Sequence, residues 1–279
     1  MDATSDRGNS RGRRSFGTYG NKGRSADLPD LEAPVSPDAV AGDASYGALD
    51  LGTNNCRLLI AKPSAHGFHV IDAFSRIVRL GEGLGKTGSL NTSAMSRTIE
   101  ALRVCSNKLF WHKVQKRRLI ATEACRMASN GAEFIARVAA ETGLELEIID
   151  RETEAQLAAT GAEPLIDPHA ESALVFDIGG GSSEIVWLDF TVSERRSRGR
   201  QVGQGEALSS MAAWASLPVG VVTLAERYGG RHVTADGFGK MIDHVTEMIR
   251  PFEDRHGFRN RIRDSSMHML GTSGTVTTI

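Results

Sequence analysis

Two segments of the chain share one pattern of apolar and polar positions: an apolar run, an aspartate, a glycine-containing polar turn and a second apolar run. In the first, YGALDLGTNNCRLLIAKP (46–63), the aspartate is Asp50; in the second, ALVFDIGGGSSEIVWL (173–188), it is Asp177. A hairpin that needs only a tight turn is satisfied by Asn-Gly or Asp-Gly. The repeated aspartate therefore predicts two similar halves that face each other across a cleft.

The region after the first hairpin predicts a third strand followed by strand-helix units. A third antiparallel strand is expected in 67–84, ending in a loop with Arg79, and the apolar spacing predicts a helix from about Asn91 to Phe110. The stretches 117–143 and 144–162 each pass from a short strand directly into a helix. This alternation predicts an α/β fold with a parallel sheet and crossover connections.

The second half repeats this plan. A third extended segment is expected near 216–224, and a long amphipathic helix follows it. The residues expected on one face of that helix are Phe238, Met241, Val245, Ile249 and Phe252. The chain then reaches MHMLGTSGTVTTI (267–279), a strand entering a Gly-Thr-Ser-Gly turn, and we expect the second domain to be incomplete at its C-terminus.

Composition favours a soluble globular protein. The chain has 279 residues, of which 40% are hydrophobic, and no apolar run approaches the ~20 residues that span a bilayer. No apolar signal segment begins the chain, so we expect a cytoplasmic protein. The formal net charge of -1 excludes a globally basic nucleic-acid binder. Cys56, Cys105 and Cys125 lack metal-ligand spacing and are expected to be reduced structural residues.

The expected domain organisation has three parts. Residues 1–44 are expected to form a disordered basic arm and an acidic linker. The first domain is expected over 45–163, from the first hairpin to the helix that follows LELEIID (144–150), and the second domain over 164–279. The arm is either a solvated tail or a weak RNA contact. The basic loop 194–200 (ERRSRGR) is either a solvated insertion or a contact for a polyanion.

The polar turns have the composition of anion-binding loops. Glycine permits positive φ and leaves backbone N–H groups unobstructed, so that they can converge on an anionic oxygen. The third turn is a further candidate, at a helix N-terminus. The candidate residues are Gly52, Thr53, Asn54 and Asn55 in the first turn, Gly179, Gly180, Gly181, Ser182 and Ser183 in the second, and Gly271, Thr272, Ser273 and Gly274 in the third.

The repeated aspartates predict a site for a divalent cation. A bare carboxylate would repel phosphate oxygens, whereas Mg²⁺ prefers one or two carboxylates together with waters and substrate phosphates. Glu184 is a third candidate ligand. A solvent-facing turn residue is the alternative for each carboxylate alone, and the repeated placement favours the metal role for Asp50 and Asp177 but not for Glu184. The predicted cofactor is Mg²⁺ or another divalent cation.

Phosphoryl transfer to water also needs a general base. Glu152 and Glu154 both lie in the first turn of the helix that follows LELEIID (144–150), and spacing does not separate them. Acidic residues also favour helix N-termini for dipole reasons worth ~0.3 to 1 kcal/mol. Arg79 and Arg126 could each bind phosphate oxygens through paired hydrogen bonds, although a surface arginine without a specific contact is the commoner case.

Seven stretches together resemble the exopolyphosphatase and guanosine pentaphosphate phosphohydrolase (Ppx/GppA) family, within the actin-like ATPase superfold. They are ALDLGTNNCRLLI, RLGEGL, ATEACRMASN, EIIDRETEAQL, FDIGGGSSEIV, SLPVGVVTLAERY and LGTSGT, in the order of the family. The resemblance implies two actin-like, ribonuclease H-like domains around a cleft. It also implies a hydrolase that releases terminal orthophosphate from polyphosphate or pppGpp.

The resemblance implies roles for individual residues. Glu154 matches the second glutamate of the family's Glu-Glu-Ala-Arg motif, where the family's catalytic glutamate lies. The resemblance therefore implies that Glu154, and not Glu152, is the general base. The remaining implied residues are Asp177 and Glu184 as metal-linked carboxylates, Asp50 as the aspartate of the first phosphate motif, and Arg79 and Arg126 as phosphate-facing arginines. Thr153, Gln156 and Asn55 depart from the family pattern, which predicts altered substrate preference or base pKa with the site retained.

The predicted activity is therefore a metal-dependent phosphohydrolase in which Glu154 activates water. Its expected partners are polyphosphate or guanosine pentaphosphate, without a membrane or a specific nucleic acid, and a homodimer is compatible with the sequence. One alternative is a non-catalytic sensor that binds polyphosphate or (p)ppGpp in the same cleft. Another is an ATP-dependent kinase, because one fold hosts many functions, but this alternative gives Glu154 no role.

Overall fold

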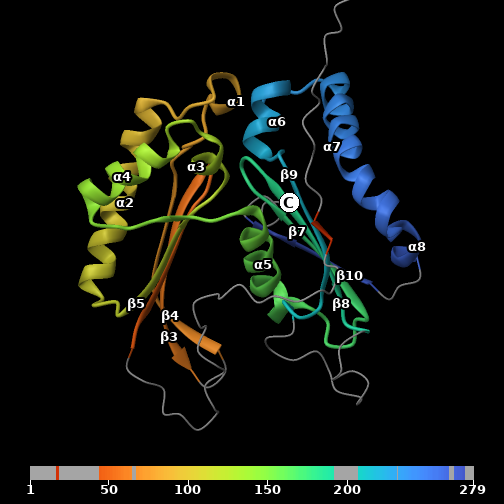
Figure 1. The fold of residues 1–279 in the computed structure, drawn as a ribbon, viewed down its shortest axis with the longest axis horizontal. Coiled ribbons are helices and arrows are strands. Elements are labelled where there is room, and N and C mark those ends of the chain that lie inside the picture. Colours follow the sequence, from red (N-terminus) through yellow and green to blue (C-terminus); the bar gives the residue numbers. More distant parts are fainter. Residues whose placement is uncertain are drawn as a thin grey trace, which may run out of the picture.

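The computed structural model describes residues 17–18, 44–64, 67–191, 207–230, 232–263 and 267–273. Within these residues the chain forms two five-stranded sheets with helices packed against them (Figure 1). The predictions for loop 194–200, for Gly274 and for most of 1–44 lie outside the described residues. In the described part of the chain, no helix has both the length and the apolar character that crossing a membrane requires.

The first sheet has the strand order β4-β3-β2-β5-β6. Its strands are β2 (Tyr46–Leu51), β3 (Asn55–Ser64), β4 (Gly67–Ile77), β5 (Lys116–Ala121) and β6 (Glu147–Ile148). β2, β3 and β4 form the predicted antiparallel meander, and β5 joins β2 in parallel. Alternating burial along β2 places Leu49 and Leu51 in the core, as the period of two in a strand requires.

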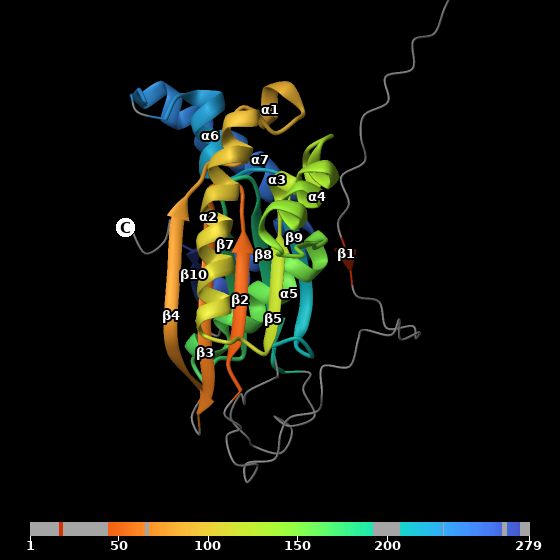
Figure 2. The ribbon, with the colours of Figure 1, turned by 90° about the vertical axis from the view of Figure 1, so that its left-hand side faces the viewer.

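Helices α2 (Thr92–Trp111) and α4 (Gly131–Thr142) cover one face of the first sheet (Figure 2), and the short helices α1 (Leu84–Thr87) and α3 (Glu123–Met127) lie near its upper end. Asn91 caps α2, because its side chain accepts a hydrogen bond of 2.7 Å from the backbone N–H of Ala94. The three cysteines are free thiols buried in this core. The bounds of α2 confirm the helix predicted from about Asn91 to Phe110.

The second sheet repeats the plan of the first. Its strand order is β1-β9-β8-β7-β10, where β7 (Ser172–Ile178), β8 (Ser183–Asp189) and β9 (Met211–Leu217) form the meander and β10 (Met267–Thr272) joins β7 in parallel. The two residues of β1 (Gly17–Thr18), within the segment expected to be an arm, pair with β9. The shared plan agrees with the expectation of two similar halves.

The third strand of this sheet lies earlier than predicted. It was expected near 216–224, but β9 ends at Leu217 and helix α6 (Val221–Tyr228) begins directly after Gly220. Residues 211–217 (MAAWASL) do alternate in burial, yet three of the seven are alanines, which are weak strand formers and hid the pattern. The Thr223 hydroxyl accepts a hydrogen bond of 2.8 Å from the N–H of Gly220, which favours a helix start there.

Two helices pack on opposite faces of the second sheet. Helix α5 (Arg151–Ala162) buries Ala155, Ala159 and Ala162 against β7 and β8, so it belongs to the core of the second sheet although the predicted boundary after residue 163 groups it with the first. Helix α7 (Ala235–His256) packs on the other face. Phe238 belongs to the predicted apolar face but is 59% exposed in the first turns of α7, which lie beside α6 (Figure 1).

Candidate functional site

The two polar turns line one cleft between the sheets, with a volume of about 670 Å³. Its predicted lining residues are Asp50, Gly52, Thr53, Asn54, Asn55, Glu154, Asp177, Gly179, Gly180, Gly181, Ser182, Glu184 and Ser273. Ser183 does not line it, because its hydroxyl is turned to the carbonyl of Val219 at 2.7 Å. The fold thus brings together residues more than a hundred positions apart.

Glycine is needed in the second turn because the two turns touch. A β-carbon added at Gly181 would lie 2.6 Å from Oγ1 of Thr53, and one at Gly180 would lie 3.1 Å from the backbone nitrogen of Asn54. None of the three consecutive glycines has a positive φ. None of them therefore supplies left-handed backbone, and close approach of the first turn is what requires glycine at 180 and 181. At Gly179 an added β-carbon would instead lie 2.8 Å from the carbonyl oxygen of Ser182 in the same turn.

Asp50 and Asp177 concentrate negative charge on the cleft wall. Burial raises the pKa of both side chains, and the charge of Asp177 raises that of Asp50 further. Arg57, the cross-strand neighbour of Asp50, lowers both pKa values, and a hydrogen bond from Thr272 also lowers that of Asp177. Two half-buried carboxylates influenced by the charge of one arginine are a donor set of hard oxygen atoms, which fits a Mg²⁺ ion that also binds phosphate oxygens.

Glu184 lies opposite Asp177 in the second hairpin and is bonded within its own sheet. It is 2% exposed, and one of its oxygens accepts a hydrogen bond of 2.9 Å from the hydroxyl of Ser216. Burial, followed by the charge of Glu154, raises its pKa to about 8. Among the described residues no group of three or more His, Cys, Asp or Glu is arranged to hold a metal ion.

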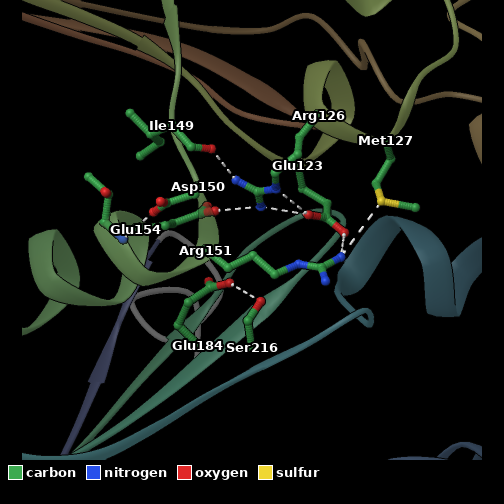
Figure 3. Close-up of polar contacts among 10 residues, drawn as sticks. Glu123, Arg126, Met127, Ile149, Asp150, Arg151, Glu154, Glu184 and Ser216 are labelled. Carbon is green, nitrogen blue, oxygen red and sulfur yellow. Dashed lines mark hydrogen bonds and ion pairs between the residues drawn. The ribbon is translucent and has the colours of Figure 1, made fainter. Parts of the chain in front are cut away.

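Of the two glutamates in the first turn of α5, Glu154 lines the cleft and Glu152 does not. The side chain of Asp150 accepts a hydrogen bond of 2.7 Å from the N–H of Thr153, which starts the helix and places Glu154 in its first turn. Burial raises the pKa of Glu154, and the guanidinium of Arg126, bonded to it at 2.8 Å, lowers it (Figure 3). Glu154 is thus a half-buried carboxylate that lines the cleft and is bonded to one arginine.

Arg126 and Arg79 do not line the cleft. Arg126 donates to Glu123, to Glu154 and to the carbonyl of Ile149, so its three nitrogens are engaged within the protein. Arg79 has an exposed side chain, and it is its backbone N–H that contacts the first turn, at 2.9 Å from the carbonyl of Asn54. The phosphate-facing role of both side chains stays a prediction.

The third turn, predicted over Gly271–Gly274, begins after Thr272 in the structure. Gly271 and Thr272 belong to β10, and Ser273 is the residue of this group that lines the cleft. The Ser273 backbone has a φ of 79°, and its hydroxyl donates to the carbonyl of Ile178 at 2.5 Å. The parallel pairing of β10 with β7 extends the strand through Thr272.

Sequence reasoning missed several residues of the cleft, among them Arg57, Ser75 and Thr122. Arg57 had a usable signal, because the hairpin register sets it opposite Asp50, and directly opposed residues share one face of a sheet. Ser75 lies opposite Arg57 on β4, which extends the same row. Thr122 follows β5 and had no comparable signal.

A profile of the Ppx/GppA phosphatase family matches residues 59–279. The chain belongs to this family. The membership inferred from the seven sequence stretches is thereby confirmed. The matched region includes the second polar turn, which lines the cleft, whereas the first turn precedes residue 59.

Solved structures of Ppx/GppA proteins are similar to this chain. An exopolyphosphatase from Cytophaga hutchinsonii is 25% identical with a TM-score of 0.69, over 84% of this chain and 68% of that one. An exopolyphosphatase-like protein is 27% identical with a TM-score of 0.67, over 84% and 67%. The Ppx/GppA family member of Aquifex aeolicus is 28% identical with a TM-score of 0.55, over 73% and 61%. The chain thus spans less than two thirds of the Aquifex protein.

Proposed function

We propose that the cleft hydrolyses the terminal phosphoanhydride bond of inorganic polyphosphate or pppGpp and releases orthophosphate. The observation that carries this proposal is that two touching polar turns and the carboxylate of Glu154 line one cleft. Backbone N–H groups of such turns bind anionic oxygens, and a carboxylate beside them can act on a water molecule. Similarity to exopolyphosphatases supports the same class of substrate.

The binding roles follow from charge. The N–H groups of the two turns would hold phosphoryl oxygens, and Arg57 would add a cation on the same wall. Asp50 and Asp177 would hold Mg²⁺ or another divalent cation, because their buried charges are otherwise balanced by one arginine. When bound, the cation neutralises charge on the phosphate and polarises its phosphorus–oxygen bonds.

Glu154 would accept a proton from water while the water oxygen attacks the terminal phosphorus. The bond from that phosphorus to the bridging oxygen breaks, and its electron pair leaves with the shortened chain. The products are orthophosphate and a polyphosphate one unit shorter. Arg126 would keep the base oriented toward the cleft through its 2.8 Å contact with Glu154.

The test is phosphate release from polyphosphate and, separately, from pppGpp, by purified protein with Mg²⁺. Glu154→Gln should lower kcat by about 100-fold or more, the usual range for loss of a general base. Glu152→Gln is the matched control, since the same change two residues earlier on α5 leaves the cleft lining intact. Equal release by wild type and Glu154→Gln would refute the role of Glu154. Saturable binding of either compound without release would instead identify a sensor.

A further inference from the structure

Glu123 is connected to the proposed base although it does not line the cleft. Its side chain is 7% exposed and lies at the start of α3. One oxygen accepts hydrogen bonds from Nε and Nη2 of Arg126 at 3.1 and 2.5 Å, and the other accepts one from Nη2 of Arg151 at 3.1 Å (Figure 3). Glu123 therefore lies between two arginines.

Arg126 is shared between two carboxylates. Its Nη2 contacts Glu123 and Glu154 together, while its Nη1 donates to the carbonyl of Ile149 at 2.6 Å. Ile149 directly precedes Asp150, the residue that caps α5. The guanidinium thus joins α3 to the start of the helix that carries the base. A buried cation needs such partners, because its desolvation is otherwise uncompensated.

Loss of Glu123 would change the partner of Arg126. Without it, Glu154 would be the remaining carboxylate bonded to the guanidinium, and an arginine that pairs with one carboxylate does so preferentially through two parallel hydrogen bonds. A base tied in that way would hold its negative charge more strongly and would accept a proton from water less readily. Arg151 acts in the opposite sense, because it neutralises Glu123 from the other side.

We propose that Glu123 is a positioning residue for hydrolysis: it shares Arg126 with Glu154 and so keeps the base oriented without letting the arginine pair with it alone. This inference rests on the proposed role of Glu154 as the base. Glu123 itself contacts neither the cleft nor the reacting atoms. Its influence on the reaction passes through Arg126.

The charged surroundings of Glu154 fix the direction of the expected effect. Burial raises the pKa of Glu154, Arg126 lowers it, and the negative charges of Glu123 and Asp50 raise it. Glu184 on β8 is a further acidic neighbour, since the charge of Glu154 raises its pKa. Replacing Glu123 removes one raising charge and frees Arg126, and both changes lower the pKa of Glu154. Replacing Arg151 leaves the negative charge of Glu123 less neutralised, and this charge then raises the pKa of Glu154 further.

The experiment measures the titration of Glu154 in the whole chain by ¹³C NMR of glutamate carboxyl groups, with Glu154→Gln to assign the signal. Glu123→Gln should shift its midpoint down by about one pH unit and Arg151→Gln should shift it up, in line with the usual effect of one close charge. Glu123→Asp keeps the charge and should restore most of the wild-type midpoint. Glu133→Gln, which removes an exposed charge on α4, is the control and should leave it unchanged.

Activity gives the second readout. Glu123→Gln should lower kcat about tenfold with KM within about twofold, and should move the acidic limb of the kcat profile to lower pH, as expected for a weakened base. A merely structural role would move the limbs of Glu123→Gln and Arg151→Gln in the same direction or not at all, and that result would overturn the proposal. If Glu123→Gln does not fold, Arg151→Gln and Glu123→Asp still decide it. If wild type releases no phosphate, the proposed function fails while the NMR titration still tests the coupling.

Discussion

Contact between the two polar turns predicts that Gly181→Ala is strongly disruptive. The added β-carbon would lie 2.6 Å from Oγ1, 3.2 Å from Cγ2 and 3.3 Å from Cβ of Thr53, and real β-carbons essentially never make a non-bonded contact shorter than 3.0 Å with another residue. Thr53 is 5% exposed, and its carbonyl accepts a hydrogen bond of 3.0 Å from Gly81. Because Thr53 is enclosed and held, the turns must separate to make room.

The expected cost is that of overpacking a well-packed site, about 1–3 kcal/mol. If the cost falls on the closed cleft, it weakens polyphosphate binding by roughly 5- to 150-fold, since about 1.4 kcal/mol corresponds to a factor of ten. The same penalty should lower the midpoint of urea unfolding if the contact also stabilises the free protein. Calorimetric titration with polyphosphate and urea denaturation measure the two effects separately.

A double variant makes this prediction specific. Thr53→Ala removes the atom at 2.6 Å and leaves the contact with Cβ at 3.3 Å, which needs only a small adjustment. The Gly181→Ala/Thr53→Ala protein should therefore recover much of the loss caused by Gly181→Ala, and the recovery is the coupling energy of the pair. Gly239→Ala, where an added β-carbon meets nothing within 4 Å, controls for the chemical change itself. Additive losses, or a Gly181→Ala protein equal to wild type, would refute the contact as the cause.

Two further predictions concern charge in the cleft. For metal-free protein, the folded-state pKa of Glu184, about 8, lies above its ordinary value of 4.5, so the folded state binds its proton more tightly and the free energy of unfolding should fall as pH rises between these values. Glu184→Gln should lose that part of the pH dependence, measured by urea denaturation at acidic, neutral and alkaline pH with a chelator present; an unchanged slope would contradict the raised pKa. Mg²⁺ should raise the thermal midpoint of wild type by mass action, and Asp50→Asn and Asp177→Asn should each remove most of that rise in scanning calorimetry. If Mg²⁺ raises the thermal midpoint of both variants as much as that of wild type, these aspartates are not ligands of the Mg²⁺ ion.

The arrangement of strands was predictable where local pattern and packing agree. The aspartate-turn pattern at 46–63 and 173–188 predicted both hairpins, because strand alternation and turn composition are local properties. Apolar spacing likewise predicted α2, and the structure adds a local capping bond from Asn91 at its start. The strand at 211–217 was misplaced because burial, and not residue type, carries its alternation, and burial depends on the helices that cover the sheet.

The partners of the arginines could not be predicted in the same way. A long side chain reaches several acceptors, and which one it contacts depends on segments that are distant in sequence. Arg126 is four residues past Thr122, yet its contacts with Glu154 and Ile149 need α5 to lie beside α3, which strand order alone does not fix. Its contact with Glu123 is different, since the i, i+3 spacing on a helix predicts it locally.

Glycine composition located the second turn correctly, but positive φ is not what requires glycine there. A need for positive φ is a local property of the backbone, whereas the need to avoid a β-carbon at 180 and 181 arises because the first turn lies against them. The contact between Gly181 and Thr53 therefore sets how closely the two anion-binding turns approach each other. In the proposed function successive phosphoryl groups lie between those turns, so the same contact would set the width available to the substrate. A change of one methyl group there would then act on binding through the distance between the two halves.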